Sequence, residues 1–197
     1  MANQIHHITV FCGSSLGTQE IFKNKARELG KKLASENIGV VYGGAKVGLM
    51  GAIADGALAE GGKVIGVLPN FLKSKEIAHE KLTELILVDT MHERKTKMND
   101  LCDGVISLPG GFGTMEEFFE MLTWGQLGLH QKPIGILNIN GFYDELIDLL
   151  DSMVEKGFLK NINRQMVLVS ENIEDLLTKM KEYEAPTIGK WINKETV

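Results

Sequence analysis

Short apolar runs recur along this chain, and most are followed by a longer segment whose apolar residues have helical spacing. The runs are apolar at nearly every position and rich in β-branched residues, which is typical of strands buried on both faces of a sheet. The pattern predicts seven strands, at His7–Phe11, Gly39–Tyr42, Val64–Leu68, Leu85–Val88, Val105–Leu108, Ile134–Ile139 and Met166–Val169.

Helices are predicted between and after these strands, at Gln19–Ser35, Val47–Glu60, Met91–Leu101, Met115–Leu127, Phe142–Lys156 and Ile173–Tyr183. This alternation favours an α/β fold with a doubly wound, mostly parallel sheet and helices on both faces. We expect one domain over residues 1–185, followed by a C-terminal tail over residues 186–197. Ligands of such sheets bind beyond the carboxyl ends of the strands, so the loops there are the first places to look for a site.

Composition narrows the possible functions. The 197 residues are 44% hydrophobic and 24% charged, with a formal net charge of −5. This balance argues against nucleic acid as a partner, because binding it needs a broad basic face. No apolar stretch approaches the roughly 20 residues that span a bilayer, and the first residues lack a basic region followed by a long apolar run. We therefore expect no membrane partner and a cytoplasmic location.

Metal and disulfide chemistry have little support in the sequence. Cys12 and Cys102 are too few and too isolated for a disulfide framework or a zinc site. The five histidines show no metal-ligand spacing. We predict no metal and no cofactor.

Three glycine-rich loops follow predicted strands, at residues 12–18, 43–48 and 109–114. None spells G-x-G-x-x-G, and Tyr42-Gly43 ends the second strand where a dinucleotide binder usually has an acid, which disfavours NAD. The P-loop motif G-x-x-x-x-G-K-[ST] is absent as well. Tight turns explain each of the first two loops as well as ligand binding does, but three loops at one sheet edge favour a binding crevice.

The segment Pro109–Glu117 is the most informative stretch, because it joins a glycine-rich turn to a carboxylate at a strand-to-helix junction. Its glycines permit φ > 0 and close approach of a ligand, and the free N–H groups of the next helix favour negative charge. Alternatively, Thr114 is only an N-cap and Glu117 closes a capping box onto it. Both can hold together, but capping alone does not require Gly110, Gly111 and Gly113. A phosphate site is therefore the better interpretation.

Three separated motifs stand in the order Gly43–Gly51, Met91–Lys95 and Pro109–Glu117. Together they resemble the Lonely Guy family of cytokinin riboside 5′-monophosphate phosphoribohydrolases, whose motif P-G-G-x-G-T-x-x-E is matched in full. The resemblance runs from about Ile8 to Tyr143. It implies a Rossmann-like fold and a homodimer with the active site near the subunit interface. The implied reaction is hydrolysis of the N-glycosidic bond of an adenine-type nucleoside 5′-monophosphate, which yields free base and ribose 5-phosphate.

Members of this group are often labelled lysine decarboxylases. That label implies a lysine in Schiff-base linkage with pyridoxal phosphate, and no lysine of this chain has a context that argues for one. We therefore set the decarboxylase interpretation aside.

The implied reaction develops positive charge on the ribose and negative charge on the base, so it needs a carboxylate near C1′ and donors for the base. We expect the N–H groups of Gly111, Gly113 and Thr114 to bind the 5′-phosphate, with a further bond from the Thr114 hydroxyl. By resemblance, Glu117 and Arg94 are the catalytic pair. Glu117 would stabilise the oxocarbenium-like ring or orient the attacking water, and Arg94 would hold the phosphate or Glu117. The substrate contacts implied by the resemblance are Glu76, Arg94, Lys95, Gly110, Gly111, Phe112, Gly113, Thr114, Met115, Glu116, Glu117 and Thr123.

Some of these residues also have simpler interpretations. From charge pattern alone, Arg94 lies on the solvated face of its helix, and Lys95 fits an exposed lysine. Glu76 fits an ordinary charge in a polar loop, and Thr123 fits a helix residue at the border of the core. Helical geometry directs Glu116 away from Glu117, which fits a solvated side chain.

Two rival functions stay open at this point. The first is a binding protein of the same fold that holds a phosphorylated ligand without cleaving it, such as a molybdenum-cofactor carrier. The second is a general nucleotide 5′-monophosphate nucleosidase whose substrate is not a cytokinin. Glycine loops do not separate binding from cleavage, and the joint presence of Arg94 and Glu117 favours the enzyme.

Overall fold

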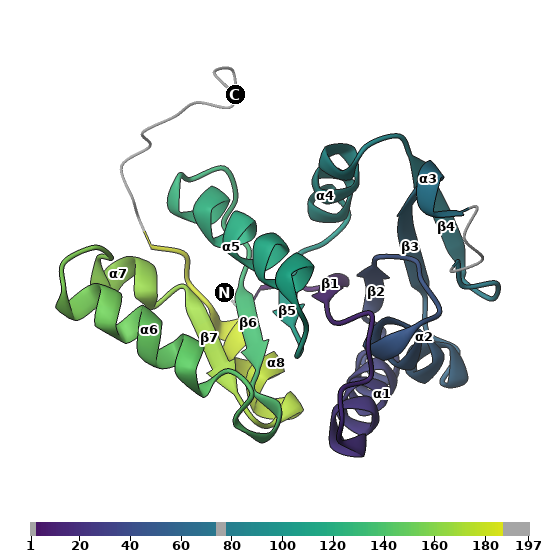
Figure 1. Ribbon diagram of the computed structural model, residues 1–197, viewed down its shortest axis with the longest axis horizontal. Coiled ribbons are helices and arrows are strands. Elements are labelled where there is room, and N and C mark those ends of the chain that lie inside the picture. The colour runs from purple at the N-terminus through teal and green to yellow at the C-terminus, as the bar shows by residue number, and fades with distance from the viewer. Residues whose placement is uncertain (1–2, 74–77, 187–197) are drawn as a thin grey trace.

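A computed structural model describes residues 3–73 and 78–186, which form a seven-stranded sheet with helices on both faces (Figure 1). Every pairing between the strands is parallel, in the order β4-β3-β2-β1-β5-β6-β7. The strands are β1 (His7–Phe11), β2 (Gly39–Tyr42), β3 (Val64–Pro69), β4 (Glu84–Val88), β5 (Gly104–Ser107), β6 (Ile134–Leu137) and β7 (Val167–Ser170). The predicted strands and the doubly wound α/β fold are confirmed.

Most of the helices agree with the prediction to within a few residues. They are α1 (Glu20–Ser35), α2 (Gly48–Ala59), α4 (Met91–Asp100), α5 (Phe112–Gln126), α6 (Asp144–Glu155) and α8 (Ile173–Glu182). Three short elements were not predicted, because three or four residues are too few to show a helical period: α3 (Asn70–Lys73), α7 (Asn161–Arg164) and the 3-10 turn η1 (Ile139–Gly141). None of the described helices combines the length and apolar character needed to cross a membrane.

Two hydrophobic cores lie on opposite faces of the sheet. Along β1, Ile8 and Val10 pack with side chains of α1, α2 and α8, whereas Phe11 packs with side chains of α4, α5 and α6. This division follows from the two-residue period of a strand, which sends alternate side chains to opposite faces. Because both faces are covered, most of the strands are apolar almost throughout, as the sequence pattern predicted. The edge strand β4 is less covered, and none of its five residues is fully buried.

The strand order places a crevice at the centre of the sheet. From β1 the chain continues outward through β2, β3 and β4, and α4 then crosses back to β5, which pairs with β1 on its other side. The helices that follow β1 and β5 belong to opposite cores. Their loops therefore diverge above neighbouring strand ends, which is where ligands bind in open α/β sheets.

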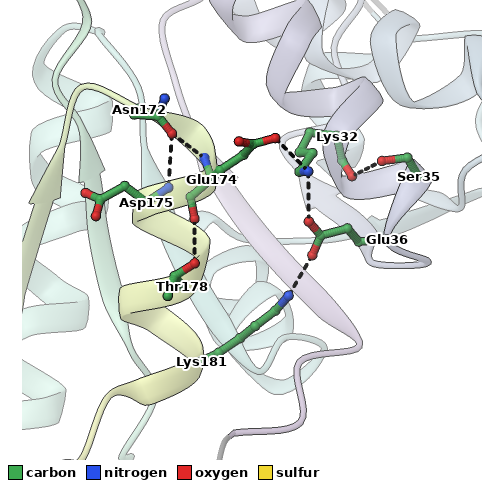
Figure 2. Close-up of polar contacts among 8 residues, drawn as sticks. All are labelled: Lys32, Ser35, Glu36, Asn172, Glu174, Asp175, Thr178 and Lys181. Carbon is green, nitrogen blue, oxygen red and sulfur yellow. Dashed lines mark hydrogen bonds and ion pairs between the residues drawn. The ribbon is translucent and has the colours of Figure 1, made fainter.

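Polar contacts join the end of α1 to α8 (Figure 2). The Nζ of Lys32 lies 3.2 Å from Glu36 and 3.0 Å from Glu174, and the Nζ of Lys181 lies 2.6 Å from Glu36. Asn172 caps α8 by accepting bonds from the N–H groups of Glu174 and Asp175. Because these ion pairs are partly exposed, they add little stability beyond the packing of both helices into the same hydrophobic core.

Two buried tyrosines offer a matched test of what a hydrogen bond to a buried hydroxyl group contributes to stability. The Tyr143 hydroxyl donates a 2.6 Å bond to the carbonyl of Leu108, the residue before the glycine-rich turn. The Tyr42 hydroxyl is also buried, but no described residue provides it with a hydrogen-bond partner. We expect Tyr143→Phe to lower the free energy of unfolding by about 1 kcal/mol, and Tyr42→Phe to be neutral or stabilising. Urea unfolding of both variants measures this, and equal losses would contradict it.

Candidate active site

Backbone hydrogen bonds join the three glycine-rich loops at the carboxyl ends of β1, β2 and β5. The Gly13 N–H donates to the Pro109 carbonyl at 3.0 Å, and the Gly13 carbonyl accepts from the Leu49 N–H at 3.0 Å. Gly48 has a φ of +60°, and a Cβ there would lie 2.2 Å from the carbonyl carbon of Ser14. The predicted meeting of the three loops at one edge is therefore confirmed, and Gly13 lies at its centre.

A cavity of about 360 Å³ opens beside this junction. Its polar wall includes Arg94 and Glu117, together with the first turn of α5. Its remaining wall comes from residues that follow β1 and β2 and from the end of β3 with α3. The full lining is Cys12, Gly13, Ser14, Gly43, Ala45, Val47, Met50, Leu68, Leu72, Arg94, Gly111, Phe112, Gly113, Thr114 and Glu117.

Helix α5 begins three residues earlier than predicted, at Phe112 in place of Met115. Gly111 is its N-cap and makes no side-chain capping bond, so the capping box between Thr114 and Glu117 is wrong. Thr114 is instead the third helical residue and Glu117 bonds outside the helix. The prediction failed because Gly113 was interpreted as part of the turn, whereas the helix includes it. The N–H groups of Phe112, Gly113 and Thr114 are therefore the free donors of the first turn.

For the three glycines of this turn, the predicted positive φ is wrong, whereas the predicted open approach to the backbone fits two of them. None of Gly110, Gly111 and Gly113 has a positive φ. A Cβ at Gly110 would lie 2.1 Å from Oγ1 of Thr114, so this position has no room for a side chain. Cβ atoms at Gly111 and Gly113 would meet nothing within 4 Å. These two glycines leave the backbone of the turn open toward the cavity that they line.

Arg94 and Glu117 form an ion pair at the cavity wall. Nη1 of Arg94 lies 2.6 Å from Oε1 of Glu117, and the two side chains are 12% and 9% exposed. Nε of Arg94 also donates a 3.2 Å bond to the carbonyl of Val67 in β3. The guanidinium therefore connects the β3 end of the sheet to α5 with its geometry fixed at two nitrogen atoms.

Burial raises the pKa of the Glu117 carboxyl above its usual value, and the charge and hydrogen bond of Arg94 act in the opposite direction. The nearby Cys12 thiol is also buried, and burial followed by the Glu117 charge raises its pKa far above the usual value. A thiol that stays protonated is a poor nucleophile. Cys12 is therefore not a candidate nucleophile.

Helix α4 is positioned mainly by polar contacts, since Met98 is its one fully buried residue. Thr90 and Glu93 form a capping box at its start. Nζ of Lys95 lies 2.5 Å from Glu116 and 3.0 Å from Glu120, both on α5. Although burial lowers the pKa of Lys95, these two carboxylates hold it above its usual value. Lys95 and Glu116 thus join α4 to α5.

The structure brings together only part of the predicted substrate set. Arg94, Gly111, Phe112, Gly113, Thr114 and Glu117 line the cavity, and the Phe112 side chain is 97% exposed. Gly110 borders an adjoining pocket of about 300 Å³. Met115 packs on the core, and the Thr123 hydroxyl donates to the Phe119 carbonyl within α5. Lys95, Met115, Glu116 and Thr123 are not part of the cavity lining, and Glu76 lies outside the described residues.

The apolar wall of the cavity was not predicted. Met50, Leu68 and Leu72 belong to apolar stretches that fit a core equally well, so no signal in their identity separates them from buried residues. They lie at the end of β3 (Leu68), in the short helix α3 that follows it (Leu72) and in the first turn of α2 (Met50). Within residues 3–73 and 78–186, no three His, Cys, Asp or Glu side chains cluster as a metal site would require.

The raised pKa of Glu117 predicts a pH dependence of stability. The folded state holds this proton up to a higher pH than the unfolded state, whose value is near 4.5. Stability associated with Glu117 is therefore present below pH 4.5 and is lost as pH rises through the folded pKa. Glu117→Gln lacks this loss, so its stability relative to the parent protein should increase from about pH 4 to about pH 7. Urea unfolding across that range measures it, and a difference that stays constant or decreases would contradict it.

Comparison with known proteins identifies the family. A family model described as possible lysine decarboxylase matches residues 50–180. A cytokinin riboside 5′-monophosphate phosphoribohydrolase of Arabidopsis thaliana is 43% identical over 182 residues, which cover 92% of this chain and 85% of the relative. Another Arabidopsis thaliana protein of the same name is 43% identical over 177 residues, covering 89% and 82%.

Solved structures share the fold at lower identity. The molybdenum cofactor binding protein of Rippkaea orientalis has a TM-score of 0.69 at 23% identity, covering 91% of this chain and 97% of that protein. The Moco carrier protein of Chlamydomonas reinhardtii has a TM-score of 0.68 at 21% identity, covering 91% and 97%. These likenesses show the fold alone. The identity to the curated enzymes decides the family, and the chain belongs to the Lonely Guy family of cytokinin riboside 5′-monophosphate phosphoribohydrolases.

Proposed function

We propose that this chain hydrolyses the N-glycosidic bond of an adenine-type nucleoside 5′-monophosphate, cytokinin riboside 5′-monophosphate or AMP, to free base and ribose 5-phosphate. The observation that supports this most directly is the 2.6 Å pair of Arg94 and Glu117 in the wall of a cavity that also contains a helix N-terminus. A carboxylate for the sugar and an anion site for the phosphate therefore lie within one pocket.

The phosphate is held at the first turn of α5. The free N–H groups of Gly113 and Thr114 point out of the helix start, where the helix dipole also favours an anion. Gly111 and Gly113 have open space where a side chain would be, so an oxygen of the ligand can approach their backbone. Thr114 lies in the cavity lining, and its hydroxyl adds a further bond.

The ribose then faces Glu117, one helical turn further along α5. The C1′–N bond breaks with its electron pair passing to the base, and the oxygen of water bonds to C1′. One proton of that water remains on the new hydroxyl, and the other is transferred to the departing base. The ionised Glu117 stabilises the positive ring and orients the water, while Arg94 keeps this buried carboxylate charged and correctly placed.

Glu117→Gln separates binding from turnover. The amide keeps the shape of the side chain but removes the charge that stabilises the ring, so we expect kcat to fall by about 10³-fold with nucleotide affinity nearly unchanged. Arg94→Ala should weaken both, because it also leaves Glu117 buried without its partner. Glu155→Gln, on α6, is the control and should match the parent protein. Base release from AMP and N6-isopentenyl-AMP is measured by chromatography.

The same assay distinguishes the rival functions. Release of adenine or its N6-alkyl derivative supports the hydrolase, whereas tight nucleotide binding without any base release would favour a carrier. Equal turnover of AMP, GMP and CMP would favour a general nucleosidase. We expect the adenine-type nucleotides to be cleaved and CMP to be left intact.

We also propose that the protein acts as a homodimer in the cytoplasm. Phe112 is 97% exposed in the cavity lining at the start of α5, and Met91 is 42% exposed at the start of α4, where a second subunit would cover them. Both cysteines are free and buried, which fits a reducing compartment. Light scattering should give a mass twice that of the 21.7 kDa chain, and Phe112→Glu should reduce it. A parent protein with the mass of a single chain would contradict the dimer.

A further inference from the structure

Gly43 follows β2 directly and lines the cavity opposite α5. A Cβ atom at this position would lie 2.5 Å from Nη2 of Arg94 and 3.2 Å from Sδ of Met50. Gly43 does not have a positive φ, so its backbone conformation does not itself require glycine. The neighbouring Gly44 differs, because its φ of +77° would strain any other residue. The constraint at position 43 is therefore the space occupied by the guanidinium.

The guanidinium of Arg94 has little freedom to move away from Gly43. On one side Nε donates to the Val67 carbonyl at 3.2 Å, and on another Nη1 bonds Glu117 at 2.6 Å. Nη2 occupies the volume above Gly43. A methyl group at position 43 must displace the guanidinium, since a separation of 2.5 Å is far below van der Waals contact. Such a displacement breaks one or both of the bonds that orient Arg94.

We propose that Gly43 is a positioning residue for the Arg94–Glu117 pair: its missing side chain leaves the space in which the guanidinium reaches the carboxylate. This inference rests on the proposed hydrolysis for its kinetic consequence, but the geometry of Arg94 can be tested without any substrate. Gly43 acts through Arg94. Its replacement should therefore have part of the effect of removing Arg94, even though both charged side chains are still present.

The groups around Glu117 predict how its pKa should change when Gly43 is replaced. Arg94 and Lys95 approach it from α4, Glu116 is its neighbour on α5, and the Cys12 thiol approaches from the end of β1. Of these groups, only Arg94 is in the path of a Cβ at position 43. Displacing Arg94 removes the interaction that favours the ionised carboxylate, so the pKa of Glu117 should rise further. A variant that merely loosened the fold would not move this value in a defined direction.

Gly43→Ala should lower kcat by about 10²-fold at neutral pH, since misplacing a catalytic group by about 1 Å has an effect of this size. The acid limb of the pH profile should also shift to higher pH. The matched control is Gly104→Ala at the opposite end of the sheet, where a Cβ would lie 2.8 Å from the flexible end of Met180. That control adds a comparable steric conflict remote from the cavity and should change neither kcat nor the pH profile.

A double variant tests whether replacement of Gly43 affects turnover through Arg94. In an Arg94→Ala background there is no guanidinium to displace, so adding Gly43→Ala should change the residual turnover by less than about 2-fold. In that background the added methyl group occupies vacated space, so Gly43→Ala should cost less stability there than it does in the parent protein. A further loss of turnover equal to that in the parent background would mean that Gly43 contacts the substrate directly, and would overturn the proposal.

The side-chain NMR signal of Arg94 gives a readout that needs no substrate. In the parent protein the Nε–H donates to Val67, so its signal should be shifted and protected from exchange with water. Gly43→Ala should move this signal and accelerate exchange, and Gly104→Ala should not. An unmoved signal in Gly43→Ala overturns the proposal. If the parent protein releases no base from any nucleotide, the proposed function fails, and this signal still decides the role of Gly43.

Discussion

The buried ion pair between Arg94 and Glu117 is the interaction on which the site depends. Its two members lie on helices that follow different strands. Arg94 belongs to α4, which crosses back from the edge strand β4, and Glu117 belongs to α5, which follows the central strand β5. The pair therefore forms only when the crossover helix is correctly placed over the sheet. Loss of either partner would leave a buried charge without compensation, which is more costly than loss of an exposed pair.

The site combines tight backbone contacts with few side chains. Gly13 links two neighbouring loops through its N–H and its carbonyl, and Gly48 has no room for a side chain against Ser14. Gly110 is excluded from bearing a side chain by Thr114, whereas Gly111 is open to the cavity. The glycines thus serve different purposes, some for packing and some for access. That division explains why a glycine count alone is a weak signal of ligand binding.

The sequence contained enough information for the sheet. All seven strands were found from their continuous apolar character, although none of the residues of the edge strand β4 is fully buried. The start of α5 was missed because Gly113 lies inside the helix, which begins at Phe112 directly after its N-cap Gly111. The role of Arg94 was not predictable from the polar pattern of α4, because its partners Val67 and Glu117 are distant in sequence. Only the motif resemblance singled it out, and the contacts of Lys95 with α5 had no signal in the chain at all.

The central claim is that a nucleotide places its phosphate at the first turn of α5 and its sugar against Glu117. The most direct test is a crystal structure of the Glu117→Gln variant with a bound nucleoside 5′-monophosphate. The account predicts phosphoryl oxygens within hydrogen-bond distance of the N–H groups of Gly113 and Thr114, with C1′ beside residue 117. A phosphate bound in a different pocket, or a nucleotide whose base rather than sugar contacts residue 117, would contradict it.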